Sequence, residues 1–256
     1  MKNIPNHSKN VFRKKDSKYC LVIPVINEGK RIIRQIESLK KFSSKVDIII
    51  ADGGSSDESL KLNFLIENNI RALLVKNDIG NLSSQLRIAY NYALNEKYKG
   101  IITVDGNGKD NMDGILLFMK YLELGYDMIQ GSRFIEGGKE INTPIIRSLA
   151  IRYIHAPIIS LISGFKYTDT TNGFRAYSKK YLEHPEVLPF RQIFKTYELL
   201  AYLSVKAPKL GLRTCEIPVT RSYPKGKTPT KISPLSGNFN LILILFNLLI
   251  GKYNIK

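Results

Sequence analysis

The sequence predicts an α/β protein built on a Rossmann-like, mostly parallel sheet with helices on both faces. Two observations support this prediction. Short apolar runs alternate with segments of helical spacing from residue 19 to residue 130, and polar loops follow several of the apolar runs. This alternation is typical of βαβ units, whose right-handed crossovers cover both faces of a sheet with helices. A chain of 256 residues is long enough for one large α/β domain with its own core, or for two small ones.

The expected elements follow one another as a parallel sheet requires. Continuous apolar runs predict buried strands, and apolar residues at helical spacing predict helices. The strands are expected at 19–26, 46–51, 71–75, 101–104, 126–130 and 213–219, with helices at 30–42, after 56, and at 82–94, 112–124, 144–164, 195–205 and 239–250. Ser56 or Asp57 should cap the second helix. Pro157 should kink or split the helix at 144–164, because proline removes an N–H donor.

The two ends of the chain differ in composition from the part between them. Residues 1–18 carry six basic residues and one acidic residue, which predicts a flexible basic arm, and they lack the apolar stretch of a signal peptide. Residues 19–235 form the expected α/β domain. Residues 236–256 hold the apolar helix 239–250, which is shorter than the ~20 residues that span a bilayer. This helix is expected in the core, at a partner interface or in a membrane surface.

The chain is strongly basic, with a formal net charge of +17. This charge favours an anionic partner: nucleic acid, an acidic membrane surface or phosphorylated small molecules. The alternative is a lysine-rich, soluble surface that binds no such partner. Nucleic acid is disfavoured, because no helix-turn-helix, RRM or zinc pattern accompanies the charge. His7, His155 and His184 form no zinc pattern, and we interpret His155 as a core histidine. Cys20 and Cys215 lie in apolar runs, which predicts buried thiols and no disulfide framework.

Three polar loops follow the first, second and fourth expected strands. They carry Asn27-Glu28, the stretch 52–58 and the stretch 105–110. Because the carboxyl ends of parallel strands meet at one edge of a sheet, these loops should lie together. Asp105 and Asn107 are two residues apart in a glycine-rich turn, and both could be aimed at one cation and its phosphates. By itself the turn fits an ordinary strand-to-helix connection equally well. The GxGxxG and GxxxxGK[ST] patterns are absent, which argues against an ordinary dinucleotide fold and a P-loop NTPase.

Five segments in order give the sequence a resemblance to a known family. They are VIPVINE (22–28), ADGGSSD (51–57), VDGN (104–107), GSRF (131–134) and TDTTNGFR (168–175). With them, residues 19–235 resemble the family 2 glycosyltransferases of the GT-A fold, and within these the dolichol-phosphate mannose synthase-like branch of polyprenyl-phosphate sugar synthases. The resemblance implies metal-dependent, inverting transfer of a sugar from a nucleotide-sugar to a polyprenyl phosphate or related lipid-linked acceptor. It also implies Mg²⁺ or Mn²⁺ as cofactor and a peripheral place on the cytoplasmic face of a membrane.

The resemblance also implies roles for particular residues. The residues expected to bind the nucleotide are Pro24, Asn27, Glu28, Asp52, Asp57 and Arg87. Asp105 and Asn107 fall on the metal-binding DxD motif, and Asp105 is also expected to be catalytic. Arg133 and Arg175 fall where this branch collects arginines near the reacting phosphate. The amide of Asn107 replaces a carboxylate and should weaken the affinity for a cation, for which Asp110 could compensate.

Two alternatives stay open at this point. If the acceptor is a sugar hydroxyl, a carboxylate base is needed, and Glu198 is the best-placed candidate; as a solvated helix residue it would have no such role. If the altered motif cannot hold a cation, the protein is a catalytically degenerate nucleotide-sugar-binding protein. The QxxRW motif of processive synthases is absent, which argues against a polymer-building enzyme.

Basic residues surround the two longest apolar stretches, 145–165 and 239–250. They are Arg147, Arg152, Lys166, Arg221, Lys225, Lys227 and Lys231. Apolar surface flanked by lysine and arginine is typical of a peripheral contact with anionic lipid. We therefore expect an anionic membrane surface among the partners, beside the nucleotide-sugar and a lipid-phosphate or glycan acceptor.

Overall fold

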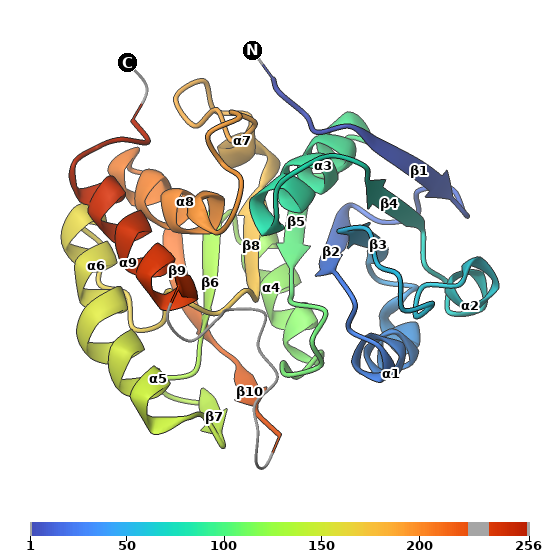
Figure 1. Ribbon diagram of the computed structural model, residues 1–256, viewed down its shortest axis with the longest axis horizontal. Coiled ribbons are helices and arrows are strands. Elements are labelled where there is room, and N and C mark those ends of the chain that lie inside the picture. Colours follow the sequence, from blue (N-terminus) through green and yellow to red (C-terminus); the bar gives the residue numbers. More distant parts are fainter. Residues whose placement is uncertain (1, 225–235, 255–256) are drawn as a thin grey trace.

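The structure is a computed structural model that describes residues 2–224 and 236–254, without the side chains of 236–239. An eight-stranded sheet of order β1-β4-β3-β2-β5-β8-β6-β9 runs through its centre, and β10 and β7 form a separate pair (Figure 1). The strands are β1 His7–Val11, β2 Tyr19–Val25, β3 Asp47–Asp52, β4 Ala72–Lys76, β5 Gly100–Thr103, β6 Met128–Ser132, β7 Lys139–Ile141, β8 Arg175–Ser178, β9 Thr214–Pro218 and β10 Thr220–Ser222.

The helices lie between these strands in the alternating order that the sequence predicts. They are α1 Lys30–Leu39, η1 Lys40–Phe42, α2 Leu62–Glu67, α3 Leu82–Asn95, α4 Gly114–Glu123, α5 Ile145–Ala150, η2 Ile151–His155, α6 Ala156–Ser163, α7 Lys179–Leu182, α8 Glu198–Lys209 and α9 Ser236–Leu249. β2, β3, β4 and β5 are mutually parallel, and β6 is parallel to β9. The predicted α/β class is therefore confirmed, with β1 and β8 as antiparallel members.

Side chains on the two faces of the sheet enter two hydrophobic clusters. Successive residues of a strand point to opposite faces, so Cys20 and Val22 of β2 pack in one cluster while Leu21 and Ile23 pack in the other. The first cluster is covered by α3 and α8, and the second by α1 and α4. Because helices cover both faces, the long apolar runs that predicted buried strands have no solvent-facing side.

The N-terminal segment is not the flexible arm that its charge predicted. Residues 7–11 form β1, which pairs antiparallel with β4 at the edge of the sheet. The Asn3 backbone N–H also donates to the Phe190 carbonyl at 3.0 Å. Backbone pairing orders this segment despite its charge.

The expected helix cap at Ser56 or Asp57 is also wrong. α2 begins later, at Leu62, with Lys61 at its N-cap position. The Asp57 carboxylate instead accepts from the backbone N–H of Gly29 at 2.7 Å and from Ser59. The loop after β3 is thereby tied to the loop after β2.

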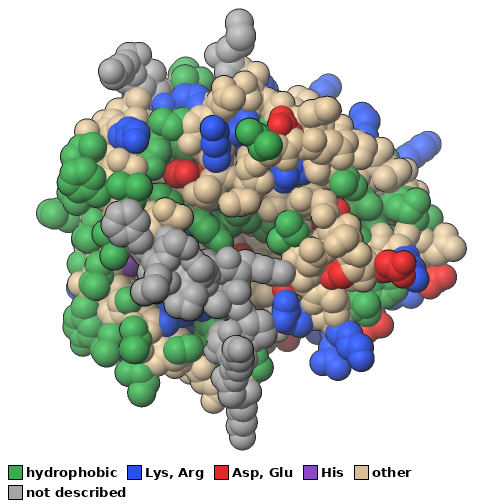
Figure 2. Space-filling model, in the orientation of Figure 1, with side chains coloured by type: hydrophobic (Ala, Val, Ile, Leu, Met, Phe, Trp, Pro, Cys, Tyr) green, Lys and Arg blue, Asp and Glu red, His purple; other side chains and the backbone are tan. Residues whose placement is uncertain are grey.

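The helix at 145–163 changes its winding where proline interrupts it. Five residues of π-helix, η2, separate α5 from α6, and Pro157 occupies the first turn of α6. Because Pro157 has no N–H to donate, the wider turn before it accommodates the break. Of the described residues, 145–163 form one helix long and apolar enough to cross a membrane, but only 17% of its apolar window is buried. Figure 2 shows its hydrophobic side chains along the left edge of the molecule.

The remaining predictions on single residues are largely confirmed. His155 is half-buried, and its Nδ1 lies 2.6 Å from Thr170 Oγ1. Burial lowers the pKa of His155 to about 4, so the ring is neutral near pH 7. Both cysteines are free, and Cys20 is fully buried while Cys215 is half-buried. The basic residues at 225, 227 and 231 lie outside the described residues.

Candidate functional site

The acidic turn after β5 is held in place from the neighbouring helix. Gln35 of α1 donates from Nε2 to the Asp105 carbonyl at 3.0 Å and accepts the Gly108 N–H on Oε1 at 2.9 Å. Gly106 packs so closely that a Cβ would lie 2.9 Å from the Pro24 carbonyl. Gln35 was not singled out from the sequence, because a glutamine on a helix carries no signal of its own.

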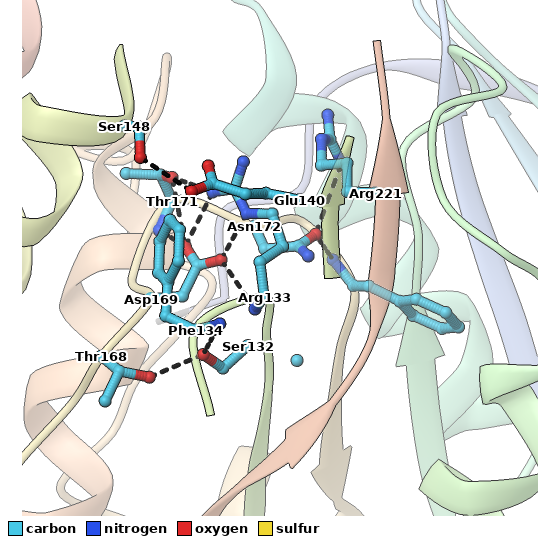
Figure 3. Close-up of polar contacts among 12 residues, drawn as sticks. Ser132, Arg133, Phe134, Glu140, Ser148, Thr168, Asp169, Thr171, Asn172 and Arg221 are labelled. Carbon is cyan, nitrogen blue, oxygen red and sulfur yellow. Dashed lines mark hydrogen bonds and ion pairs between the residues drawn. The ribbon is translucent and has the colours of Figure 1, made fainter. Parts of the chain in front are cut away.

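The carboxylates of this turn share one buried arginine. Arg221 of β10 donates from Nη1 to Asp110 Oδ2 at 2.5 Å and from Nη2 to Asp105 Oδ2 at 2.8 Å. Its Nη1 also lies 3.3 Å from the Asn172 side-chain oxygen. Arg221 and Asn172 are labelled in Figure 3. Burial acts to lower the pKa of Arg221, but the two carboxylates raise it well above its usual range. The guanidinium is therefore a permanent positive charge between Asp105 and Asp110.

More cations gather around Tyr223, next to Arg221. Lys109 Nζ lies 4.9 Å from the centre of the Tyr223 ring, and the Arg147 guanidinium lies 5.6 Å from it. Arg147 Nη1 also reaches the Tyr223 hydroxyl at 3.4 Å. Burial would raise the pKa of Tyr223, but the charges of Arg221, Arg147 and Arg133 lower it. This basic cluster, formed by Lys109, Arg133, Arg147 and Arg221, suits an anion such as phosphate.

Arg133 is fixed by a buried carboxylate. Its Nε lies 2.6 Å from Asp169 Oδ2 and its Nη2 lies 2.9 Å from Asp169 Oδ1, with Thr171 as a further acceptor (Figure 3). Burial acts to raise the pKa of Asp169, but Arg133 and the hydrogen bonds lower it below its usual range. Arg133 Nη1 is buried and has no hydrogen-bond partner among the described residues. A buried donor without a protein partner can be satisfied by a ligand or by water.

Arg175 does not lie where the sequence led us to expect. Its Nε donates to the Asn172 carbonyl at 2.8 Å, and Nη2 donates to the Thr170 carbonyl at 2.7 Å. Its Nη1 is bonded to the Leu200 carbonyl and to Ser204 of α8. All three nitrogens are used by the protein, so Arg175 shapes the loop that carries Asn172 and is not available to a phosphate.

The loops after β2 and β3 interlock, as their place on the sheet predicts. Asn27 accepts the Ser56 N–H at 2.8 Å, and its own N–H donates to Ser55 Oγ at 3.0 Å. Asp52 accepts from the N–H and hydroxyl of Ser55. Asp57 is bonded to Gly29 N–H as described above. Asn27, Asp52 and Asp57 therefore belong to one structural unit, and the Pro24 carbonyl joins it to the acidic turn by accepting the Gly106 N–H at 3.3 Å.

Three other predicted residues make contacts of a different kind. Glu28 forms an ion pair with Arg31 at 2.7 Å. Arg87 donates to the Asn3 side chain in the N-terminal segment and to the Phe194 carbonyl, so it binds the protein itself and does not fit the expected nucleotide-binding role. Glu198 accepts the backbone N–H groups of residues 195 and 196 at the start of α8. The Glu198 carboxylate is occupied by these hydrogen bonds at the start of α8, which does not fit the role of a free general base.

Comparison with known proteins places the chain in a family. The model of glycosyl transferase family 2 matches residues 20–184. This chain belongs to glycosyl transferase family 2. The glycosyltransferase is 26% identical to a UDP-N-acetylglucosamine–dolichyl-phosphate N-acetylglucosaminyltransferase of Methanococcus voltae, with 93% of this chain and 98% of the relative covered. It is 22% identical to an undecaprenyl-phosphate mannosyltransferase of Micrococcus luteus, with 78% and 81% covered.

A likeness to solved structures confirms the GT-A fold. Glucosyl-3-phosphoglycerate synthase from Mycobacterium tuberculosis, in complex with Mn²⁺, UDP-glucose and phosphoglyceric acid, superposes with a TM-score of 0.65. The match covers 91% of this glycosyltransferase and 79% of that chain at 13% identity. At this identity the likeness establishes the fold alone.

The acidic turn of the glycosyltransferase has oxygen donors for a divalent cation, but few of them. Within residues 2–224 and 236–254, no group of three His, Cys, Asp or Glu side chains is placed to hold a metal ion. Asp105, Asn107 and Asp110 nevertheless offer the hard oxygen ligands that Mg²⁺ and Mn²⁺ prefer. Asp110 Oδ1 is buried without a hydrogen-bond partner among the described residues, and the Asp105 side chain is 26% exposed. The donor set therefore fits a cation once Arg221 gives up its contact with Asp105.

Proposed function

We propose that this glycosyltransferase moves a sugar from a nucleotide-sugar to a polyprenyl phosphate, or a related lipid-linked acceptor, with inversion at the anomeric carbon. The names of the two relatives support a lipid phosphate as acceptor. The observation that carries the proposal is the position of Arg147. This residue reaches Tyr223 in the basic cluster from α5, a helix whose apolar side chains face outward.

The surroundings of Arg147 fit an amphipathic acceptor. Ile145 and Ile146, which precede it on α5, are 78% and 84% exposed. A lipid phosphate needs apolar surface for its chain and cations for its head group, and this end of α5 offers both. Arg133 Nη1, which lacks a partner among the described residues, is a further donor for the phosphate oxygens.

The donor is assigned to the loops on the other side of the acidic turn. Asn27, Asp52 and Asp57 form the interlocked unit that we propose as the nucleotide site, with Pro24 in its floor and Glu28 at its margin. The diphosphate would then extend toward Asp105, because the Pro24 carbonyl joins this unit to the acidic turn. When bound at Asp105, Asn107 and Asp110, Mg²⁺ or Mn²⁺ supplies positive charge to the leaving nucleoside diphosphate.

The proposed reaction requires the protein to position the reactants and to supply positive charge near the phosphates, but it requires no general base. A phosphate monoester is an anion near neutral pH and attacks without a general base, so positioning supplies much of the rate. Arg133 and Arg147 would hold this nucleophile. The contacts of Glu198 with the start of α8 weigh against the glycan-directed alternative, in which Glu198 is the base. The catalytically degenerate alternative is kept open by Asn107 alone.

Peripheral attachment to the cytoplasmic face of a membrane completes the proposal. Exposed apolar side chains lie along α5, η2 and α6, and α9, which packs against α6, exposes more. The most exposed of these apolar side chains are Ile145, Ile146, Tyr153, Leu161, Ile242 and Phe246. Arg147 and Arg152 lie on the same long helix. This combination matches the composition of a helix that lies in an anionic membrane surface.

The experiment is a transfer assay with purified protein, a panel of labelled UDP-, GDP-, CDP- and dTDP-sugars, and undecaprenyl or dolichyl phosphate in detergent. We expect label in the organic phase, and an Arg147→Gln variant with kcat/KM lowered roughly 30-fold, as for one lost hydrogen bond to a charged group. Arg34→Gln, at an exposed position on α1, is the matched control and should keep full activity. Transfer to no lipid phosphate, or a normal rate for Arg147→Gln, would contradict the proposal.

Glu198→Gln separates the two enzymatic alternatives. The lipid-phosphate proposal expects at most a modest loss, since Gln still accepts a backbone N–H at the start of α8. Complete loss of transfer with an intact fold would favour the glycan-directed enzyme.

A further inference from the structure

The place between Asp105 and Asp110 already holds a cation, the guanidinium of Arg221. Both contacts are short, at 2.8 Å to Asp105 and 2.5 Å to Asp110, and the Arg221 side chain is only 7% exposed. A guanidinium bonded to two carboxylates occupies the same electrostatic position as a divalent ion held by them. The two cations therefore compete for the same oxygens.

The two contacts of Arg221 differ in how easily they break. Asp110 is fully buried, and separating it from Arg221 would leave a buried charge without a partner. Asp105 is 26% exposed, and water can solvate its carboxylate when the guanidinium leaves. For a divalent cation to take the place of Arg221 at Asp105, only Nη2 has to release its carboxylate. Nη1 can stay on Asp110.

The backbone of β10 keeps Arg221 beside the turn during this exchange. The Asn111 N–H donates to the Thr220 carbonyl at 3.0 Å, and the Ser222 N–H donates to the Lys109 carbonyl at 2.7 Å. These bonds fix the main chain on either side of Arg221 to the acidic turn. Movement is then confined to the side chain, and the released Nη2 remains within reach of a diphosphate at Asp105.

We propose that Arg221 is an internal competitor of the divalent cation: it closes the metal position when the donor is absent and passes from Asp105 to the diphosphate when donor and metal bind together. The proposal rests on the proposed function, because it takes Asp105 as the metal-binding carboxylate of a nucleotide-sugar site. Charge balance favours the coupled step. Asp105, Asp110 and Arg221 sum to −1, so a divalent ion alone leaves the group at +1, and the diphosphate supplies the missing negative charge.

The test measures binding of Mn²⁺ alone, by the loss of the free-ion EPR signal on titration with protein. Because the closed position reduces apparent affinity by the fraction of molecules that are open, wild type should bind Mn²⁺ weakly. Arg221→Gln should bind it at least tenfold more tightly. Arg147→Gln removes one positive charge from the same basic cluster without opening the position, and its gain should stay below threefold. Asp105→Asn should abolish tight binding in the Arg221→Gln background.

Two results would overturn the proposal. One is an affinity for Mn²⁺ in Arg221→Gln that equals or falls below that of wild type. The other is a gain in affinity for Mn²⁺ in Arg147→Gln that equals the gain in Arg221→Gln. The effect would then come from the loss of any nearby positive charge and not from opening the metal position. If Arg221→Gln does not fold, judged by circular dichroism, Arg221→Lys replaces it. Lysine is shorter and has one nitrogen in place of the two that contact Asp110 and Asp105, which weakens the hold on Asp105. A gain in affinity for Mn²⁺ is therefore again expected, and its absence again overturns the proposal. The readout involves no sugar transfer, so failure of the transfer assay and failure of this competition are distinguishable.

Discussion

Replacement of Asp169 by asparagine tests the pairing that fixes Arg133 in the site. The two side chains are 0% and 1% exposed, and their shortest contact is 2.6 Å. The change keeps the shape but leaves the guanidinium buried without its counter-charge, which costs about 3–5 kcal/mol. For a chain of this size each kcal/mol lowers Tm by about 2–4 °C, so the expected fall in Tm is about 6–20 °C.

The assays are thermal melting, which gives Tm, and urea denaturation, which gives the free energy of unfolding, of wild type and Asp169→Asn at pH 7. Glu183→Gln is the control. Glu183 pairs with Lys179 at 3.7 Å on the surface, and such pairs contribute at most about 1 kcal/mol. Because the pKa of Asp169 is lowered in the folded state, its contribution should persist above about pH 4 and disappear as the pH falls through that lowered pKa. A loss below about 1 kcal/mol at pH 7, or one equal to that of the control, would refute the assignment of a buried, ionised pair.

Three further predictions concern the turn, the histidine and the apolar face. Gln35→Leu removes both bonds that hold the acidic turn and should lower kcat/KM roughly 10- to 100-fold with a native circular dichroism spectrum. Since the pKa of His155 is about 4, below its unfolded value of about 6.5, stability should fall by about 3 kcal/mol from pH 6.5 to pH 4, and His155→Gln should flatten this dependence in urea denaturation. Ile146→Glu with Leu161→Glu should abolish sedimentation with anionic liposomes, whereas Ile79→Glu, equally exposed at 80% in a distant loop, should not.

Most of the sheet could be predicted because buried parallel strands have an unambiguous pattern. β2, β3 and β5 are apolar on both faces, and a helix covers each face. β1 could not be predicted from its residues, His7–Val11, because an edge strand is held by backbone bonds to β4 and needs no apolar pattern. The delayed start of α2 has a similar cause: Asp57 uses its carboxylate on the neighbouring loop and not on a helix end.

In the candidate site too, the features set by sheet topology could be predicted, and those set by side-chain contacts could not. Asn27, Asp52 and Asp57 could be placed together, because topology brings strand ends to one edge whatever the side chains do. Residue type does not reveal whether an arginine meets a ligand or the protein's own carbonyls. Arg87 and Arg175 proved to bond backbone oxygens, whereas Arg221, which the sequence suggested only as part of a basic surface, lies at the centre of the acidic turn.

The amide at position 107 has a physical rationale once the positive charge of Arg221 is counted together with the carboxylates of the acidic turn. The sequence alone made Asn107 look like the loss of a metal ligand. With a third carboxylate there, the group around Arg221 would carry −2, which a divalent ion could balance without any donor. With Asn107 the group carries −1, and a divalent ion is balanced only when the diphosphate arrives. On the proposed mechanism, Asn107 and Arg221 act in the same direction, since both make metal binding depend on the donor, and the altered motif is then compatible with an active enzyme.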